Sequence, residues 1–166
     1  MIKIKRIHTS DAELYSFMEN LLISSFPEEE YRELHVLREY TDTTPIFYNN
    51  IIFDEETAVG FITYWDLGSF YYIEHFAIDP GRRNGGYGQK MLQLLKEILN
   101  RPIVLEVELP NEDMAKRRIN FYKRQGYALW ENDYFQPPYK PGYGNLPMYL
   151  MVNGELNSEK DFEEIK

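Results

Sequence analysis

Residues 82–88, with the sequence RRNGGYG, have the composition of a loop that binds an anion. They follow an apolar run that ends in Asp79-Pro80 and precede an amphipathic run that begins near Tyr87. A glycine-rich turn between a strand and the N-terminus of a helix presents backbone N–H groups, and glycine lets a phosphate approach the main chain closely. The segment therefore predicts a phosphate-binding loop.

Two common nucleotide-binding loops do not fit this segment. A Walker loop requires lysine and then serine or threonine after its second glycine, but Tyr87 and Gly88 follow Gly86. The Rossmann fingerprint requires a third glycine after Gly86-x-Gly88, and Met91 stands there instead. Both nucleotide interpretations are disfavoured.

The pattern that fits is RxxGxG, formed by Arg83, Gly86 and Gly88, which resembles the pyrophosphate loop for acyl-CoA in the GNAT family of N-acetyltransferases. The resemblance continues through four consecutive elements in the family's order. These are the strand YYIEHFAIDP, the helix GYGQKMLQLLKEIL, the strand IVLEVELP and the helix RRINFYKRQGY.

The resemblance implies a mixed α/β fold of the GNAT type. A mostly antiparallel central sheet of about seven strands would be flanked by helices and splayed at the acetyl-CoA site. The implied reaction is direct transfer of an acetyl group from acetyl-CoA to a primary amine. We expect one GNAT domain over residues 1–154 and an acidic C-terminal tail over residues 155–166.

The resemblance also implies which residues hold acetyl-CoA, except for Arg118, where this sequence departs from the family pattern. Arg118 shares a helix face with Met114 and Phe121, so it either reaches to water or pairs with an anion, and we expect it to contact a CoA phosphate. The expected cofactor-binding residues are Phe76, Ala77 and Ile78 through their backbones, together with Arg83, Asn84, Gly85, Gly86, Tyr87, Gly88 and Arg118.

Glu74 is the candidate general base. An alkylamine with a pKa near ~10.4 is almost entirely protonated at pH 7, so amine acetylation needs a proton acceptor. Glu74 lies within the apolar run YYIEHFAI, where burial would raise its pKa. Strand alternation would place it on one face with Phe76 and Ile78. The alternative is a structural carboxylate paired with an arginine or tyrosine, and His75 is the second candidate base.

Tyr122 is the candidate general acid, on the strength of the resemblance. It lies in NFYKRQGY, which looks like the family segment whose tyrosine hydroxyl lies next to the thioester sulfur. The alternative is a core aromatic, since Ala115, Ile119 and Tyr122 share one helix face. Ala115 stands where the family often has an asparagine that contacts pantetheine.

Periodicity predicts the elements that would position these residues. Alternation over residues 2–7 predicts an edge strand. Helical spacing predicts one helix that ends before Phe26, one over residues 28–40, one that ends before Arg101 and one over residues 112–125. Further strands are expected at 46–54, 58–67, 71–79, 103–109, 127–133 and 146–154.

Composition narrows the function further. A net charge of −9 disfavours nucleic acid and favours a cationic partner, and the apolar runs are too short for a membrane helix. We expect a cytoplasmic protein. The absence of cysteine excludes an acyl-cysteine intermediate, and the three histidines lack the spacing of a metal site.

Three functions stay open from the sequence: an N-acetyltransferase, a non-catalytic acyl-CoA-binding regulatory module, and an interaction domain. The acceptor is also open among polyamine, aminoglycoside, amino acid and peptide amines. The tyrosine- and proline-rich loop from Tyr134 to Tyr143 would either wall the acceptor site or contact a second copy in a homodimer.

Overall fold

The computed structural model describes residues 2–136, 139 and 146–154. In this part of the chain, one sheet has the strand order β1-β2-β3-β4-β5-β7-β6. The strands are β1 Ile2–Arg6, β2 Phe47–Asp54, β3 Thr57–Asp66, β4 Tyr71–Ile78, β5 Ile103–Glu108, β6 Ala128–Gln136 and β7 Leu146–Asn153. The helices are α1 Ala12–Ser25, α2 Leu34–Thr43, α3 Tyr87–Ile98 and α4 Asp113–Arg124, with 3-10 turns η1 Glu28–Glu30 and η2 Pro80–Gly85.

The sheet is mixed and mostly antiparallel, as the sequence predicts. All neighbouring strands are antiparallel except β4 and β5. The strand with the clearest period-two alternation, β1, lies at one edge.

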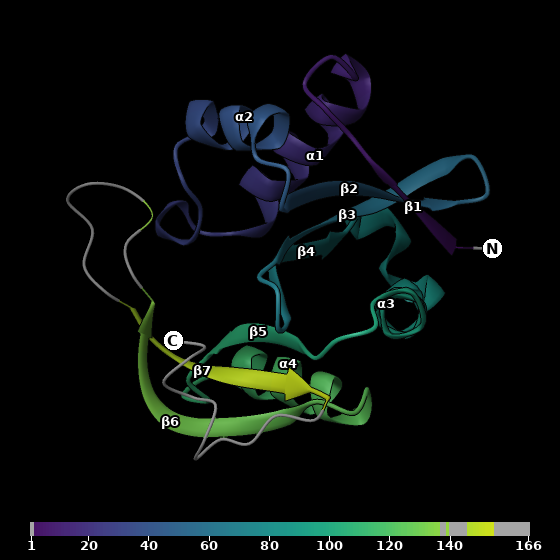
Figure 1. The fold of residues 1–166 in the computed structure, drawn as a ribbon. Coiled ribbons are helices and arrows are strands. Elements are labelled where there is room, and N and C mark those ends of the chain that lie inside the picture. Colours follow the sequence, from purple (N-terminus) through teal and green to yellow (C-terminus); the bar gives the residue numbers. More distant parts are fainter. Residues whose placement is uncertain (1, 137–138, 140–145, 155–166) are drawn as a thin grey trace.

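Helices cover both faces of the sheet (Figure 1). On one face, α1 and α2 bury Met18, Leu22 and Leu37 against Phe47 and Phe61. On the other face, the buried residues of α3 and α4 pack against those of the sheet in a second cluster, which includes Met91, Leu95, Leu105, Ile119 and Met151. The helices thus pack against both faces of the sheet and hold its central strands in place.

The helix expected over residues 28–40 is divided in the structure. A 3-10 turn ends at Glu30, Tyr31 is extended with φ −143° and ψ 154°, and α2 starts only at Leu34. Tyr31 turns into the core, where it is 8% exposed, and Arg32 forms an ion pair with Glu74 of β4. These tertiary contacts override the helix propensity of the acidic segment, and they bring a cation to the centre of the sheet.

The sheet divides between its two parallel strands. Pairing of β4 with β5 covers Tyr71↔Ile103, Tyr72↔Val104 and Ile73↔Leu105. Beyond these pairs, β4 stays paired with β3 as far as Ile78, and β5 stays paired with β7 as far as Glu108. The splayed middle strands expected from the sequence are therefore present.

Candidate active site

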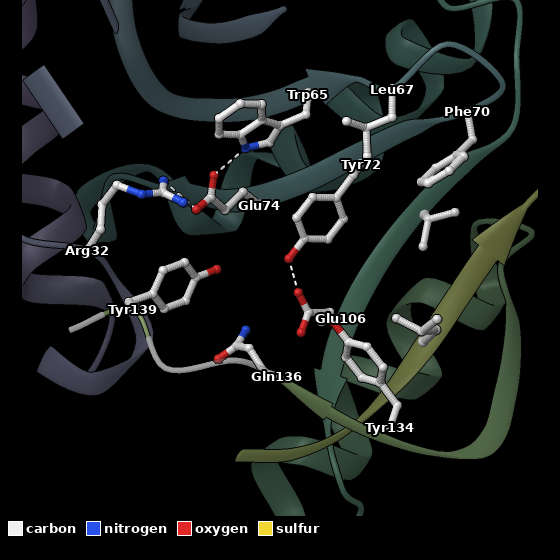
Figure 2. Close-up of a pocket in the computed structure, with 12 residues that line it drawn as sticks. Arg32, Trp65, Leu67, Phe70, Tyr72, Glu74, Glu106, Tyr134, Gln136 and Tyr139 are labelled. Atoms are coloured by element: carbon white, nitrogen blue, oxygen red, sulfur yellow. Dashed lines mark hydrogen bonds and ion pairs between the residues drawn. The ribbon is translucent and has the colours of Figure 1, made fainter. Parts of the chain in front are cut away.

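A cavity of about 360 Å³ lies where β4 and β5 part (Figure 2). Its size is at the lower end of small-molecule sites, which span roughly 300–1,000 Å³. We call it the central cavity. It is lined by Arg32, Trp65, Leu67, Phe70, Tyr72, Glu74, Val104, Glu106, Tyr134, Gln136, Tyr139 and Leu150.

A β-bulge turns Glu74 toward the central cavity. Thr63 pairs with His75 and Tyr64 pairs with Ile73, so Glu74 is the extra residue of β4. The prediction that Glu74 shares a face with Phe76 and Ile78 is wrong, because the bulge interrupts the alternation. Phe76 and Ile78 pack on the α3 and α4 face, whereas Glu74 lines the cavity on the other face.

Glu74 is buried, and each of its carboxylate oxygens contacts a donor group. Its side chain is 1% exposed, its Oε1 lies 2.5 Å from Arg32 Nη1, and its Oε2 accepts a hydrogen bond from Trp65 Nε1 at 2.6 Å. The Arg32 guanidinium also lies 5.2 Å from the Tyr139 ring centre, within cation–π range. This geometry matches the paired-carboxylate alternative, because both oxygens of Glu74 already contact donor groups.

Glu106 is a second cavity carboxylate, and the sequence analysis did not select it. Tyr72 donates a hydrogen bond to its Oε1. Burial raises the pKa of Glu106 to about 7, and the nearby Tyr134 hydroxyl and Gln136 amide offset part of that rise. No cation of the described lining residues pairs with it. The signal was available, because Glu106 interrupts the apolar run IVLEVE just as Glu74 interrupts its own strand.

His75 has a structural role. It is 7% exposed, its Nε2 lies 2.7 Å from the carbonyl oxygen of Glu30, and its ring meets the Phe26 ring edge-on. Because a carbonyl only accepts hydrogen bonds, Nε2 carries the proton. Burial lowers the pKa of His75, which keeps the ring neutral. Its contacts anchor β4 to the segment that carries Arg32.

Tyr122 lies on the opposite face of the sheet from Glu74 and Glu106. It packs at the edge of the α3 and α4 core, next to Phe121 and Tyr127, and does not line the central cavity. Burial raises the pKa of Tyr122 to about 12, so its hydroxyl stays protonated at neutral pH. Pairing of β4 with β5, which separates the two faces, ends at Ile73 and Leu105.

The glycine-rich loop leads from β4 into α3 as the sequence predicts. Asp79 accepts a hydrogen bond from the Gly81 backbone N–H, and η2 is followed by Gly86, which has φ +70° and precedes α3. A Cβ on Gly86 would meet no protein atom within 4 Å, so the glycine is required by the backbone and not by packing. Gly88 has a packing role, because its Cβ would lie 3.1 Å from Phe121 Cζ.

The structure describes the side chains of only some of the other residues predicted to bind acetyl-CoA. The side chains of Arg83 and Asn84 lie outside the described residues. Tyr87 donates a hydrogen bond to Asp54 at 2.6 Å, which ties α3 to β2. A Cβ on Gly85 would lie 2.7 Å from the Tyr87 ring, so this ring fills the space beside the loop.

Arg118 is exposed and lies 3.5 Å from Glu108 in an ion pair. Met114, which the sequence places on the same helix face, is 60% exposed. Its predicted contact with CoA stays a prediction.

Among the described residues, no three histidine, cysteine or acidic side chains are grouped to hold a metal ion. Within the same part of the chain, none of the helices combines the length and the apolar character needed to cross a membrane.

The model of the acetyltransferase (GNAT) family matches residues 12–127. This chain belongs to the GNAT acetyltransferase family. A solved structure from Bacteroides thetaiotaomicron, described as a GNAT acetyltransferase, is 63% identical to it. The match covers 98% of this chain and 93% of that one, with a TM-score of 0.96. The protein is therefore a transferase, and its family uses acetyl-CoA.

More distant structures share the GNAT fold. An aminoglycoside 6'-N-acetyltransferase complexed with coenzyme A has a TM-score of 0.68 at 17% identity, covering 93% of this chain and 98% of that one. A chimeric spermidine N-acetyltransferase from Vibrio cholerae has a TM-score of 0.65 at 15% identity, covering 97% and 98%. These likenesses show the fold alone. No curated protein sequence gives a significant match.

Proposed function

We propose that this acetyltransferase moves an acetyl group from acetyl-CoA directly to a primary amine bound in the central cavity. The observation that carries the proposal is that Glu74 and Glu106 follow the last paired residues of β4 and β5 and line one cavity. A cavity with a carboxylate at the opening of the sheet suits an ammonium group that must lose a proton. Fold neighbours named for spermidine and for aminoglycosides, which carry primary amines, support this acceptor class.

The residues present fit acetyl-CoA. Gly86 is left-handed with open space beside it, directly before α3, and this suits a diphosphate at the helix N-terminus. The segment of β4 after Ile73 is not paired with β5, so the backbone of residues 76–78 can bind an extended pantetheine arm as an added strand would bind. Gly85, Gly86, Tyr87 and Gly88 would hold the diphosphate, with Arg83, Asn84 and Arg118 as further predicted contacts.

Acetyl-CoA supplies an acyl group already activated as a thioester. Glu106 accepts one proton from the ammonium of the acceptor, which frees the nitrogen lone pair. The new carbon–nitrogen bond forms as the carbon–sulfur bond breaks, and Tyr122 donates its hydroxyl proton to the departing sulfur from the other face. The acetylated nitrogen loses its second proton to solvent as the amide forms. Glu106 then releases its proton to solvent and Tyr122 regains one, so that one proton is released overall.

Glu74, the base expected from the sequence, takes a positioning role in this proposal. Its ion pair with Arg32 and its hydrogen bond from Trp65 hold the wall of the cavity opposite Glu106. The absence of cysteine excludes an acyl-cysteine intermediate, which agrees with direct transfer.

The test is release of CoA thiol by purified protein supplied with acetyl-CoA and a broad panel of primary amines. We expect amine-dependent release, with the acetylated amine identified by mass spectrometry. If no amine stimulates release while acetyl-CoA still binds, the proposal is wrong.

A further inference from the structure

The central cavity is polar at one end and apolar at the other. Glu74, Glu106 and Gln136 lie toward the end where the strands separate, as Figure 2 shows. The opposite end is lined by Leu67, Phe70, Val104 and Leu150. Phe70, Val104 and Leu150 belong to one buried apolar cluster. A molecule that fills this cavity therefore needs one polar end and one apolar end.

The lining residues leave one uncompensated charge. Arg32, Glu74 and Glu106 are the charged residues among the described lining side chains, and Arg32 neutralises Glu74. Glu106 remains to balance a single ammonium. A second ammonium at the apolar end would lose its hydration without gaining a partner, which is strongly unfavourable.

The position of the chemistry fixes how the acceptor lies. With the pantetheine arm bound along residues 76–78 of β4, the thioester approaches the cavity where β4 and β5 are unpaired, beside Glu74 and Glu106. The reacting nitrogen must lie there. The rest of the acceptor then extends beneath the paired segment of the two strands, toward Phe70 and Leu67.

Aromatic and amide groups complete this site. The rings of Tyr72 and Tyr134 flank the passage from Glu106 to the apolar end (Figure 2), where they can contact a flat apolar body. Gln136 is 7% exposed, and its Oε1 has no hydrogen-bond partner among the described residues. This oxygen is therefore a hydrogen-bond acceptor available to a bound molecule.

We propose that the acceptor is a compact primary monoamine whose nitrogen is joined through a short chain to an aromatic ring or a similar apolar body. The nitrogen lies beside Glu106, and the apolar body occupies the end formed by Leu67, Phe70, Val104 and Leu150. This inference rests on the proposed acetyl transfer and selects among its acceptors.

The first test compares kcat/KM at saturating acetyl-CoA for 2-phenylethylamine, spermidine and kanamycin. We expect 2-phenylethylamine to exceed the other two by at least tenfold. Equal or better turnover of spermidine or kanamycin would overturn the inference and leave the acetyl transfer intact. Failure to acetylate any amine of a broader panel would instead overturn the proposed function on which the inference rests.

The second test adds a carboxylate at the apolar end. Leu67 is 44% exposed, so Leu67→Asp should fold, and thermal melting checks this. We expect at least a tenfold loss of kcat/KM with 2-phenylethylamine and a smaller loss, or a gain, with spermidine. Ile23→Asp is the matched control, because Ile23 on α1 is 45% exposed and does not line the cavity. Equal effects of Leu67→Asp on both amines would contradict the inference.

Discussion

Glu74 and Glu106 line the same cavity from two strands that part immediately before them, and among the described lining residues a cation pairs with Glu74 alone. The bulge in β4 and the extended segment that carries Arg32 create this difference. One carboxylate is thereby held in an ion pair, whereas burial raises the pKa of the other to about 7. The division of roles between the two acids underlies the predictions below.

The ion pair of Arg32 with Glu74 should be important for stability. Arg32→Met leaves the buried Glu74 charge unpaired, and we expect it to lower the free energy of unfolding by about 3 kcal/mol. Adding Glu74→Gln should recover more than half of that loss. Urea unfolding of the single and double variants measures both effects.

The control for this prediction is Arg38→Met. Arg38 pairs with Glu19 at 3.0 Å, but its side chain is 56% exposed, so the loss should stay below about 1 kcal/mol. If Arg32→Met is no more harmful than Arg38→Met, the buried pair does not have the importance assigned to it.

The hydroxyl of Tyr122 should matter for turnover and not for binding. We expect Tyr122→Phe to lower kcat by about 10²-fold, the lower range for general acid catalysis, with an unchanged dissociation constant for CoA. Because burial raises the pKa of Tyr122 to about 12, wild-type activity should show no loss from its ionisation below about pH 11.

Tyr127→Phe is the matched control. The Tyr127 hydroxyl is buried without a hydrogen-bond partner among the described residues, so its removal should leave kcat unchanged and stability equal or higher. An equal fall in kcat for both variants would remove the acid role from Tyr122.

Alanine variants at Gly86 and Gly68 distinguish the loss of a ligand contact from backbone strain. Both have positive φ, +70° and +90°, and a Cβ on either meets no protein atom within 4 Å. Alanine at each should cost a similar amount of stability, about 1–2 kcal/mol. Only Gly86→Ala should weaken acetyl-CoA binding, by tenfold or more in calorimetry. Equal affinities of the two variants would place the diphosphate elsewhere.

The sequence predicted most helices and strands of the fold, and its family. Periodicity identified the elements, and the loop at Gly86 with the order of four elements indicated the family, which the family match confirms. These features are local in sequence. The expected catalytic and cofactor-binding residues, by contrast, stay predictions.

The parts of the site that were missed depend on tertiary structure. The bulge at Glu74 breaks a period-two rule that assumes an uninterrupted strand, and no residue type in YYIEHFAI marks it. Arg32 was expected in a helix. It lies outside one because it pairs with Glu74 on β4, a contact that the local sequence does not reveal. Glu106 carried the same signal as Glu74, but only its place beside the parting strands shows its importance.

The most direct test of the account is the pH dependence of kcat/KM for wild-type protein and Glu106→Gln. Taking their ratio removes the ionisation of the amine itself, which is common to both. Glu106 is the base when ionised, so the ratio should rise as the pH increases through about 7 and then level off at about 10² or more.

Glu131→Gln, an exposed change on β6, should give a ratio to wild type near one at every pH. A ratio of wild type to Glu106→Gln that is also near one, or that does not change between pH 5 and pH 9, would contradict the account.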